Sequence, residues 1–235
     1  MSELPGKGGI SRLVVDASSL ISLSGNCMIK ILCALSKSAG ISFHIPMSVY
    51  SEAVERPLTI RRFELSAVRI KDAVDSGCLS VEHGTPETGR LTMEIGDCGN
   101  CMNYADGRPL RLIQAGETES LALARTICAK GIVIDERTMR MLAEDPYALR
   151  RFLEHRYGRS ISLDKRRLSR FRESTQGIPF FRSSEIVALA YERGLFEPEL
   201  PQEKRALEAA LYAVKFEGCA VSMREIDSYL KGVRE

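Results

Sequence analysis

Two aspartates in this 235-residue chain stand where buried strands are expected to end. Asp16 follows the apolar run Leu13–Val15, and Asp135 follows Ile132–Ile134. Short runs without a polar residue indicate strands that are covered on both faces. Open α/β sheets bind ligands beyond the carboxyl ends of their strands. The two patterns therefore predict two carboxylates at one edge of a parallel sheet.

Two glutamates stand near predicted helix starts. Glu117 opens a helix after Gly116, and Glu52 lies in the first turns of a helix predicted over 48–55. The helix macrodipole favours acids at such positions whatever their function, and Asp16 could in the same way cap a nearby helix. Each acid alone has this structural explanation, whereas all four recurring at sheet-edge positions favour a shared site.

The stretch Gly116–Ala143 supplies the main pattern for the fold. Leu121 and Ala124 recur at helical spacing, and the strand that stops at Asp135 leads into a second helix. Helices that alternate with buried strands predict an α/β fold with a central, mainly parallel, twisted sheet and helices on both faces. We expect a single domain over residues 1–235.

Apolar periodicity and turn residues predict the remaining elements. We expect strands over 41–46 and 78–81, helices over 28–35, 60–74, 185–193 and 222–233, and a buried helical stripe of Leu207, Ala210, Leu211 and Val214. Pro57 should break or kink the helix that begins near Ser48.

Residues 83–112 are punctuated by Gly and Pro, which predicts an insertion or a long loop. Leu91–Ile95 is typical of a hairpin arm, and Asp106-Gly107 is typical of a turn. Cys98 and Cys101 form a lone CxxC, which is half of a zinc site or a redox pair, or else plain thiols or a local disulfide.

Cysteine usage and hydropathy bear on the compartment. The seven cysteines are an odd number at irregular spacing, and Cys33 and Cys128 lie in apolar contexts, which predicts reduced, buried thiols. No apolar run approaches the ~20 residues that cross a bilayer, and the N-terminus lacks a basic-then-apolar signal pattern. We expect a cytoplasmic protein with no membrane contact.

A strongly basic segment lies within residues 148–172. It holds nine Lys and Arg against Glu154 and Asp164, a net charge of +7; because the whole chain carries +2, the rest carries −5. Such asymmetry suggests a polyanion partner, with a solvated arginine-rich helix as the alternative. The basic residues are Arg150, Arg151, Arg156, Arg159, Lys165, Arg166, Arg167, Arg170 and Arg172.

Four stretches taken together resemble the PIN-domain nucleases. They are VVDASSLISL, IPMSVYSEAVE, GETESLALA and IVIDERTMR, in this order and spacing. The branch that they resemble is the prokaryotic and archaeal one related to VapC-type toxin ribonucleases. The resemblance covers most of residues 12–81, 113–147 and 180–233, and it leaves 83–112 and 148–178 outside as inserts.

The resemblance assigns the acids in chain order. The first family acid matches Asp16, with a hydroxyl at Ser18. The second matches Glu52, the third Glu117 and the fourth Asp135. This assignment implies a catalytic site built from four carboxylates.

Three auxiliary positions follow from the same resemblance. Glu119 accompanies the third acid, and Arg140 matches a basic position that the family often keeps. Glu136 stands where the family often has a second aspartate, and this departure leaves its role open.

Four carboxylates in one pocket repel one another unless a cation neutralises them, so the cluster implies a metal. Oxygen ligands without His or Cys select Mg²⁺ or Mn²⁺. We expect Asp16 and Asp135 to be direct ligands, and Glu117 to be a ligand or the base for water. Glu52 is expected as an outer ligand, and Ser18 would hold water or the scissile phosphate.

The resemblance implies a Mg²⁺- or Mn²⁺-dependent endoribonuclease, with RNA as substrate and an antitoxin protein or a second copy of the chain as further partners. The basic segment would hold the RNA backbone through phosphate contacts. Tyr157 and Phe171 could stack on bases, with core packing as the alternative for Phe171.

Two other classes of protein stay open. One is a non-catalytic RNA- or partner-binding protein that keeps the PIN fold. The other is a magnesium-dependent, phosphatase-like α/β enzyme, which requires Asp-x-Asp after its first strand. Ser18 occupies the place of that second aspartate, which argues against this class.

Overall fold

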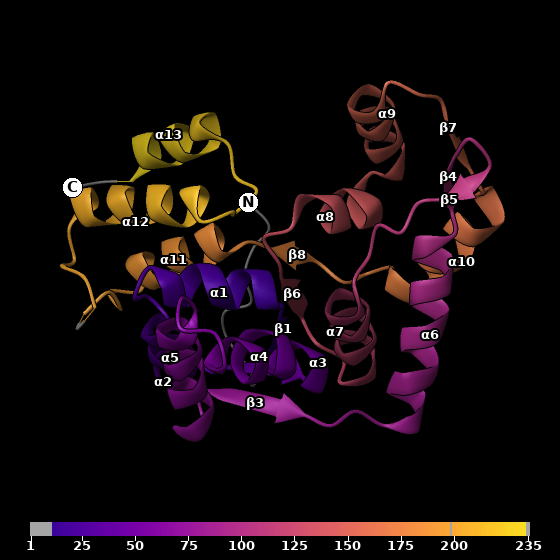
Figure 1. The fold of residues 1–235 in the computed structure, drawn as a ribbon. Helices are drawn as coiled ribbons and strands as arrows, with labels where there is room; N and C mark the ends of the chain where they lie inside the picture. The colour runs from indigo at the N-terminus through magenta and orange to yellow at the C-terminus, as the bar shows by residue number, and fades with distance from the viewer. Residues whose placement is uncertain (1–10, 198, 234–235) are drawn as a thin grey trace.

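The computed structural model describes residues 11–197 and 199–233, and Figure 1 shows their arrangement. At its centre lies a sheet whose five strands, within these ranges, follow the order β3-β2-β1-β6-β8. All neighbouring strands in this sheet are parallel. The strands are β1 (Ser11–Val15), β2 (Ile41–Pro46), β3 (Leu79–Glu82), β6 (Gly131–Val133) and β8 (Phe180–Phe181). The predicted α/β class with a mainly parallel sheet is therefore confirmed.

Alternate residues of β1 enter different cores. Leu13 and Val15 pack into one apolar cluster and Val14 into another, and all three side chains are fully buried. Because successive side chains of a strand point to opposite faces, the two clusters lie on opposite faces of the sheet. Each cluster is completed by apolar residues from helices, as the uninterrupted apolar run of β1 requires.

The first face is covered by the N-terminal and C-terminal parts of the chain, which lie together in Figure 1. Its elements are α1 (Ala17–Gly25), α2 (Lys30–Ala39), α3 (Met47–Tyr50), η1 (Ser51–Glu55), α4 (Arg56–Leu58), α5 (Glu64–Asp75), α11 (Ser183–Glu192), α12 (Lys204–Phe216) and α13 (Met223–Gly232).

The second face is covered by the middle of the chain. Its helices are α6 (Pro86–Asn100), α7 (Ala115–Thr126), α8 (Arg137–Glu144), α9 (Pro146–Tyr157) and α10 (Lys165–Thr175). A small antiparallel sheet of β5 (Arg108–Pro109), β4 (Asn103–Ala105) and β7 (Ile161–Leu163) lies beyond them. Within this layer α7 packs directly on β1 and β2, and α6 packs on α7.

The prediction of a loop or hairpin over residues 83–112 is wrong for its first half. Leu91–Ile95 lies inside α6, which begins at a capping box made by Thr85 and Thr88. Leu91, Ile95 and Cys98 form the buried stripe of this helix. The predicted turn at Asp106-Gly107 is present, and both residues have positive φ.

The glycines of α6 explain this error. A Cβ on Gly99 would lie 2.0 Å from the Cδ1 atom of Ile113, and one on Gly96 would lie 3.3 Å from the side chain of Thr118. These glycines therefore permit close packing of α6 against α7 and against the segment that leads into it. Sequence alone does not separate a packing glycine from a turn glycine.

The two predicted inserts build one unit. β4, from residues 83–112, pairs with β7, from residues 148–178, and α10 packs against α6. The basic segment contributes to the core, because Leu153, Leu168 and Phe171 are buried. The alternative of core packing for Phe171 is therefore the one that the structure supports.

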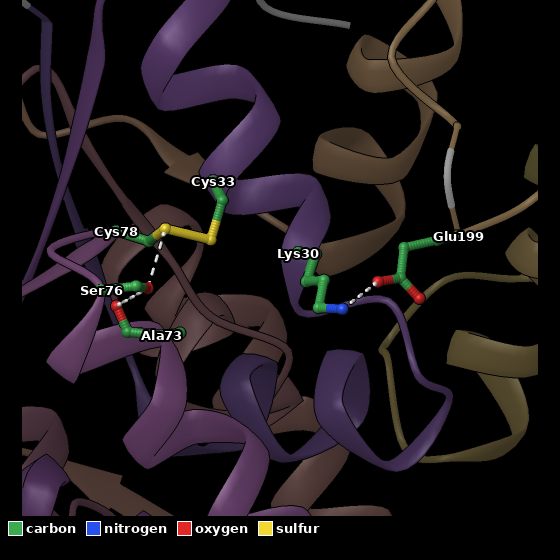
Figure 2. Close-up of a disulfide and its surroundings, with 6 residues drawn as sticks. All are labelled: Lys30, Cys33, Ala73, Ser76, Cys78 and Glu199. Atoms are coloured by element: carbon green, nitrogen blue, oxygen red, sulfur yellow. Dashed lines mark hydrogen bonds and ion pairs between the residues drawn. A yellow bond between two sulfur atoms is a disulfide. The ribbon is translucent and has the colours of Figure 1, made fainter.

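The prediction of a reduced thiol at Cys33 is wrong. Figure 2 shows a disulfide between Cys33 on α2 and Cys78, the residue before β3. These residues are 45 positions apart in sequence, and their Cα atoms lie 4.8 Å apart because α2 and the start of β3 meet on one face of the sheet. Cys98 and Cys101 are free thiols, and Cys128 is exposed rather than buried.

No single helix in residues 11–197 and 199–233 is long and apolar enough to cross a membrane. α1 and α2 pass the length and composition criteria together, but their axes are bent by 108°.

Candidate functional site

The two strand-end aspartates lie on neighbouring strands. Asp16 directly follows β1, and Asp135 follows β6, which pairs with β1 in parallel register. The backbone N–H of Asp16 donates to the carbonyl of Val133 at 2.9 Å, so the strand ends are level. Both side chains are almost completely buried, at 3% and 2% exposure.

Ser18 joins these two strand ends. Its backbone N–H and its hydroxyl both donate to Asp16 Oδ2, at 3.0 and 2.8 Å. The same hydroxyl oxygen accepts the backbone N–H of Asp135 at 3.1 Å. Ser18 thus orients the Asp16 carboxylate. Asp16 is also the N-cap of α1, which is the capping role that the sequence offered as its structural explanation.

Glu117 lies in the first turn of α7, where its Oε2 accepts the backbone N–H of Gln114 at 2.7 Å. Burial raises the pKa of Glu117 to about 8, and the charges of Asp16, Glu136 and Glu52 act in the same direction, against the Gln114 hydrogen bond. Glu117 is therefore both a helix cap and a member of an acidic cluster.

Asp16 belongs to the same acidic cluster. Burial raises its pKa to about 6, the hydrogen bonds from Ser18 oppose this shift, and the charge of Glu52 adds to it. A buried carboxyl group whose pKa is raised in this way, beside other carboxylates, is typical of a functional site. A bound cation would favour the ionised forms of these acids.

Glu52 reaches the cluster from η1, a turn of π-helix between α3 and α4. A Cβ on Gly116 would lie 3.1 Å from Glu52 Oε2, so the missing side chain of this glycine lets the carboxylate approach the start of α7. Single π-helical turns are frequent at functional sites. Pro57, which was predicted to break or kink the helix that begins near Ser48, lies in α4, the short helix after this π-helical turn.

The Asp135 carboxylate is held at the start of α11. Its Oδ1 accepts the backbone N–H of Ser183 at 2.8 Å, and its Oδ2 is buried without a hydrogen-bond partner in the described residues. Cys219 lies nearby, since the backbone N–H of the next residue, Ala220, donates to the carbonyl of Asp135 at 3.2 Å. Burial, and then the charge of Asp135, raise the pKa of the Cys219 thiol to about 11. The helix predicted over 185–193 begins two residues earlier, at Ser183, and no sequence signal pointed to Cys219.

The auxiliary residues have structural partners. Glu119 accepts the backbone N–H of Ser48 at 3.1 Å, which ties α7 to α3. Glu136 caps α8 by accepting the backbone N–H of Met139 at 2.7 Å. Arg140 forms an ion pair with Glu144 at 3.2 Å.

The donor atoms of the cluster suit a hard divalent cation, because they are carboxylate oxygens. Asp135 Oδ2 is an acceptor without a partner in the described residues, and the pKa values of Asp16 and Glu117 are raised mainly by burial and further by neighbouring carboxylates. In the part of the chain that the structure describes, however, no group of three or more His, Cys, Asp or Glu side chains is arranged to hold a metal ion. Donor chemistry and charge fit Mg²⁺ or Mn²⁺, and a three-ligand set requires movement of these side chains.

The basic segment forms α9, β7 and α10. Arg150, Arg159 and Arg167 form ion pairs with Glu154, Asp106 and Asp97. The exposed basic residues for which the described part of the chain shows no ion pair are Arg151, Arg156, Lys165, Arg166, Arg170 and Arg172. α10 packs on α6 and α7, and α9 packs on α8, so the basic helices contact the helix whose first turn holds Glu117 and the helix that Glu136 caps.

A scan against protein-family models, a search of curated proteins and a search of solved structures found no match to this chain.

Proposed function

We propose that this chain is a metal-dependent endoribonuclease of PIN type. The observation that supports the proposal most is the meeting of Asp16, Glu52 and Glu117 in one electrostatically coupled cluster beside the end of β6. Each of these acids has a structural role as a single residue, but helix capping does not require three carboxylates to repel one another. The resemblance of the surrounding motifs to PIN-domain nucleases supplies the reaction class.

In this proposal Asp16 and Asp135 would hold the cation, and Asp135 Oδ2, which has no hydrogen-bond partner in the described residues, would be one of the oxygen ligands. Bound Mg²⁺ or Mn²⁺ would supply activation of water and charge stabilisation for phosphodiester hydrolysis. Burial raises the pKa of Glu117 to about 8 in the metal-free protein, so its carboxyl group is largely protonated at neutral pH. A cation bound beside it would lower this pKa, and the Glu117 carboxylate would then accept a proton from the attacking water. Ser18 keeps Asp16 oriented, and Glu52 contributes charge from the outer side.

RNA is the substrate that the surface charge favours. Arg166 and Arg170 are exposed on α10, which packs on α7, the helix that carries Glu117. Such residues bind phosphates with little regard to base sequence. The basic helices would thus hold the backbone of RNA beside the acidic cluster.

The test is cleavage of labelled RNA in Mg²⁺ or Mn²⁺ by purified protein and by Asp16→Asn and Asp135→Asn variants. Both variants should lose cleavage by at least ~10²-fold because a ligand charge is removed. Asp75→Asn, which changes an exposed acid at the end of α5, is the matched control. Full cleavage by folded Asp16→Asn protein would overturn the proposal.

A non-catalytic RNA-binding protein is the second candidate. The observation that favours it is that the described acids are not gathered into a three-ligand set. Under this alternative, RNA binds through α9 and α10, and a titration of Mg²⁺ or Mn²⁺ into the RNA complex produces no cleavage at any concentration. Metal-dependent cleavage that Asp16→Asn abolishes would exclude it.

A further inference from the structure

A second group of polar side chains lies apart from the acidic cluster, on the sheet face that α7 covers. Arg12 of β1, Ser42 and His44 of β2, and Glu82 of β3 belong to this face, because the residues that alternate with them pack into the opposite core. Arg12 and Ser42 are register partners on adjacent strands. The face is therefore polar where the strands β2 and β3 approach the edge of the sheet.

Three of these side chains form a hydrogen-bonded chain. Ser42 Oγ lies 2.9 Å from His44 Nε2, and His44 Nδ1 lies 2.8 Å from Glu82 Oε1. When Nδ1–H donates to the carboxylate, Nε2 is left as the acceptor for the serine hydroxyl. This is the order of nucleophile, base and orienting acid that acyl-transfer enzymes use, and such sites are recognised by geometry rather than by sequence order.

A cavity of about 460 Å³ lies at Glu82, the acidic end of this chain of hydrogen bonds. Glu82 lines it together with His83, Thr88, Leu123 and Ile127, among others. Arg12 reaches the same wall, since its Nη1 donates to the carbonyl of Ile127 at 3.0 Å. β2 lies between β1 and β3 in the sheet, so Ser42 and His44 on β2 are flanked by Arg12 on β1 and by Glu82 on β3.

Arg12, the register partner of Ser42 on the adjacent strand, offers hydrogen-bond donors for the oxyanion of acyl transfer. A guanidinium carries five N–H donors, and the bond to Ile127 uses one of them. The others are available to an oxyanion that develops on a carbonyl group bonded to Ser42. The region thus combines a nucleophile, a base, an orienting acid, a cation and a cavity.

We propose that Ser42, His44 and Glu82 form a second catalytic site, which hydrolyses carboxylic esters with a small, weakly polar acyl group. Ser42 Oγ bonds to the carbonyl carbon as His44 Nε2 takes its proton, and the alcohol then leaves with that proton. Water, deprotonated by His44, attacks the acyl-serine, releases the carboxylic acid and restores the hydroxyl of Ser42. Glu82 holds the imidazole in the required tautomer. This activity goes beyond the proposed nuclease and uses none of its acids.

The test uses the full chain in EDTA, so that metal-dependent chemistry is absent. A fluorophosphonate probe should label the protein, and peptide mass spectrometry should place the label on Ser42. Hydrolysis of p-nitrophenyl acetate should fall at least ~10²-fold in Ser42→Ala and in His44→Ala. Glu82→Gln, which keeps the shape but removes the charge, should lower the rate by at least about tenfold.

Ser80→Ala is the matched control, because Ser80 is an exposed serine on the same face and the register partner of His44. It should leave labelling and hydrolysis unchanged. Circular dichroism melts verify that each variant is folded. The label is located on the wild-type chain, so that result does not depend on whether any variant folds. Absence of a label on Ser42 in folded wild-type protein, or equal hydrolysis by wild type and Ser42→Ala, would refute the site.

Discussion

At the scale of single residues, burial changes the acidity of two carboxyl groups at the edge of the sheet. The pKa of Asp16 rises from 3.8 to about 6 and that of Glu117 from 4.5 to about 8 on folding. A group whose pKa is higher in the folded state contributes stability that is complete below its unfolded pKa and is lost as pH rises through its folded pKa. We therefore expect the metal-free protein to lose stability between about pH 4 and about pH 8.

This prediction is checked by thermal melts in EDTA at intervals from pH 5 to pH 8.5. The melting temperature should fall as pH rises, and the fall should be shallower in Asp16→Asn, which no longer titrates. Added Mn²⁺ should reduce the fall, because a ligand that binds the native state stabilises it and competes with protons for the carboxylates. A melting temperature that rises over this range would contradict the assignment of the shifts.

Ser183 permits a sharper test of how Asp135 is held. Its N–H donates to Asp135 Oδ1, and it is the first residue of α11, a position that tolerates proline. Arg182 before it has φ −109° and ψ 159°, the extended conformation that proline favours in the preceding residue. The backbone conformation there suits proline, so Ser183→Pro removes this hydrogen bond, and its Cδ atom, in place of the N–H, pushes the Asp135 carboxylate away.

Under the proposed function, Ser183→Pro should raise the Mn²⁺ concentration at the midpoint of a thermal-shift titration by about 10-fold. Ser183→Ala keeps the N–H and removes a hydroxyl that has no partner in the described residues, so it should titrate like the wild type. Equal midpoints for all three proteins would show that this hydrogen bond does not position Asp135.

At the scale of elements, the Cys33–Cys78 disulfide ties α2 to the start of β3. The loop that it closes contains β2, η1 and α5, and so includes Glu52. Closing a loop of this length typically stabilises a fold by about 2–4 kcal/mol. We expect Cys33→Ser with Cys78→Ser to lower the free energy of unfolding by that amount.

Urea denaturation with and without a phosphine reductant checks this value. The reductant should destabilise the wild type and leave the double variant unchanged, which separates loss of the cross-link from loss of packing. Wild-type curves that are insensitive to complete reduction would contradict a stabilising role.

Elements also differ in how far sequence could predict them. The buried strands that end at Asp16 and Asp135 were predictable because a strand covered on both faces must be apolar throughout. α6 was not predictable, because glycines such as Gly96 and Gly99 indicate turns in a sequence, whereas in the structure they allow two helices to pack closely. The disulfide was not either, since proximity of Cys33 and Cys78 depends on how distant elements assemble.

The candidate site shows the same division. The four acids could be selected from strand ends, helix starts and the order of the motifs. The hydrogen bond from Ser183 to Asp135 could not be predicted, because it depends on β8 pairing with β6 and so placing the start of α11 beside that aspartate. Local patterns thus identified the charges, and long-range pairing fixed their orientation.

At the scale of the whole molecule, two segments that lie outside the PIN resemblance form one unit that packs on α7 and carries the basic segment. Exposed cations on α10 should contribute to RNA affinity through the release of counterions. Replacement of Lys165, Arg166, Arg170 and Arg172 by Gln should weaken RNA binding and flatten its dependence on salt, by about 0.7 in log–log slope for each lost phosphate contact.

Filter-binding titrations at several salt concentrations measure this slope. A matched control replaces four cations on the other layer, Arg61, Arg62, Arg193 and Arg205, which lowers the net charge by the same amount. A similar decrease in both variants would mean that total charge, rather than the basic segment, sets the affinity.

The disulfide has a further consequence for a chain that has been cut. Thr59–Arg62 is exposed, lies outside the helices α4 and α5, and falls inside the covalent ring closed by Cys33 and Cys78. Trypsin cleavage after Arg61 would place Asp16 and Glu52 on one fragment and Glu117 and Asp135 on the other. The fragments would migrate as one band on a non-reducing gel and separate after reduction, so a nicked molecule keeps its four acids tethered for as long as the sulfur bond survives.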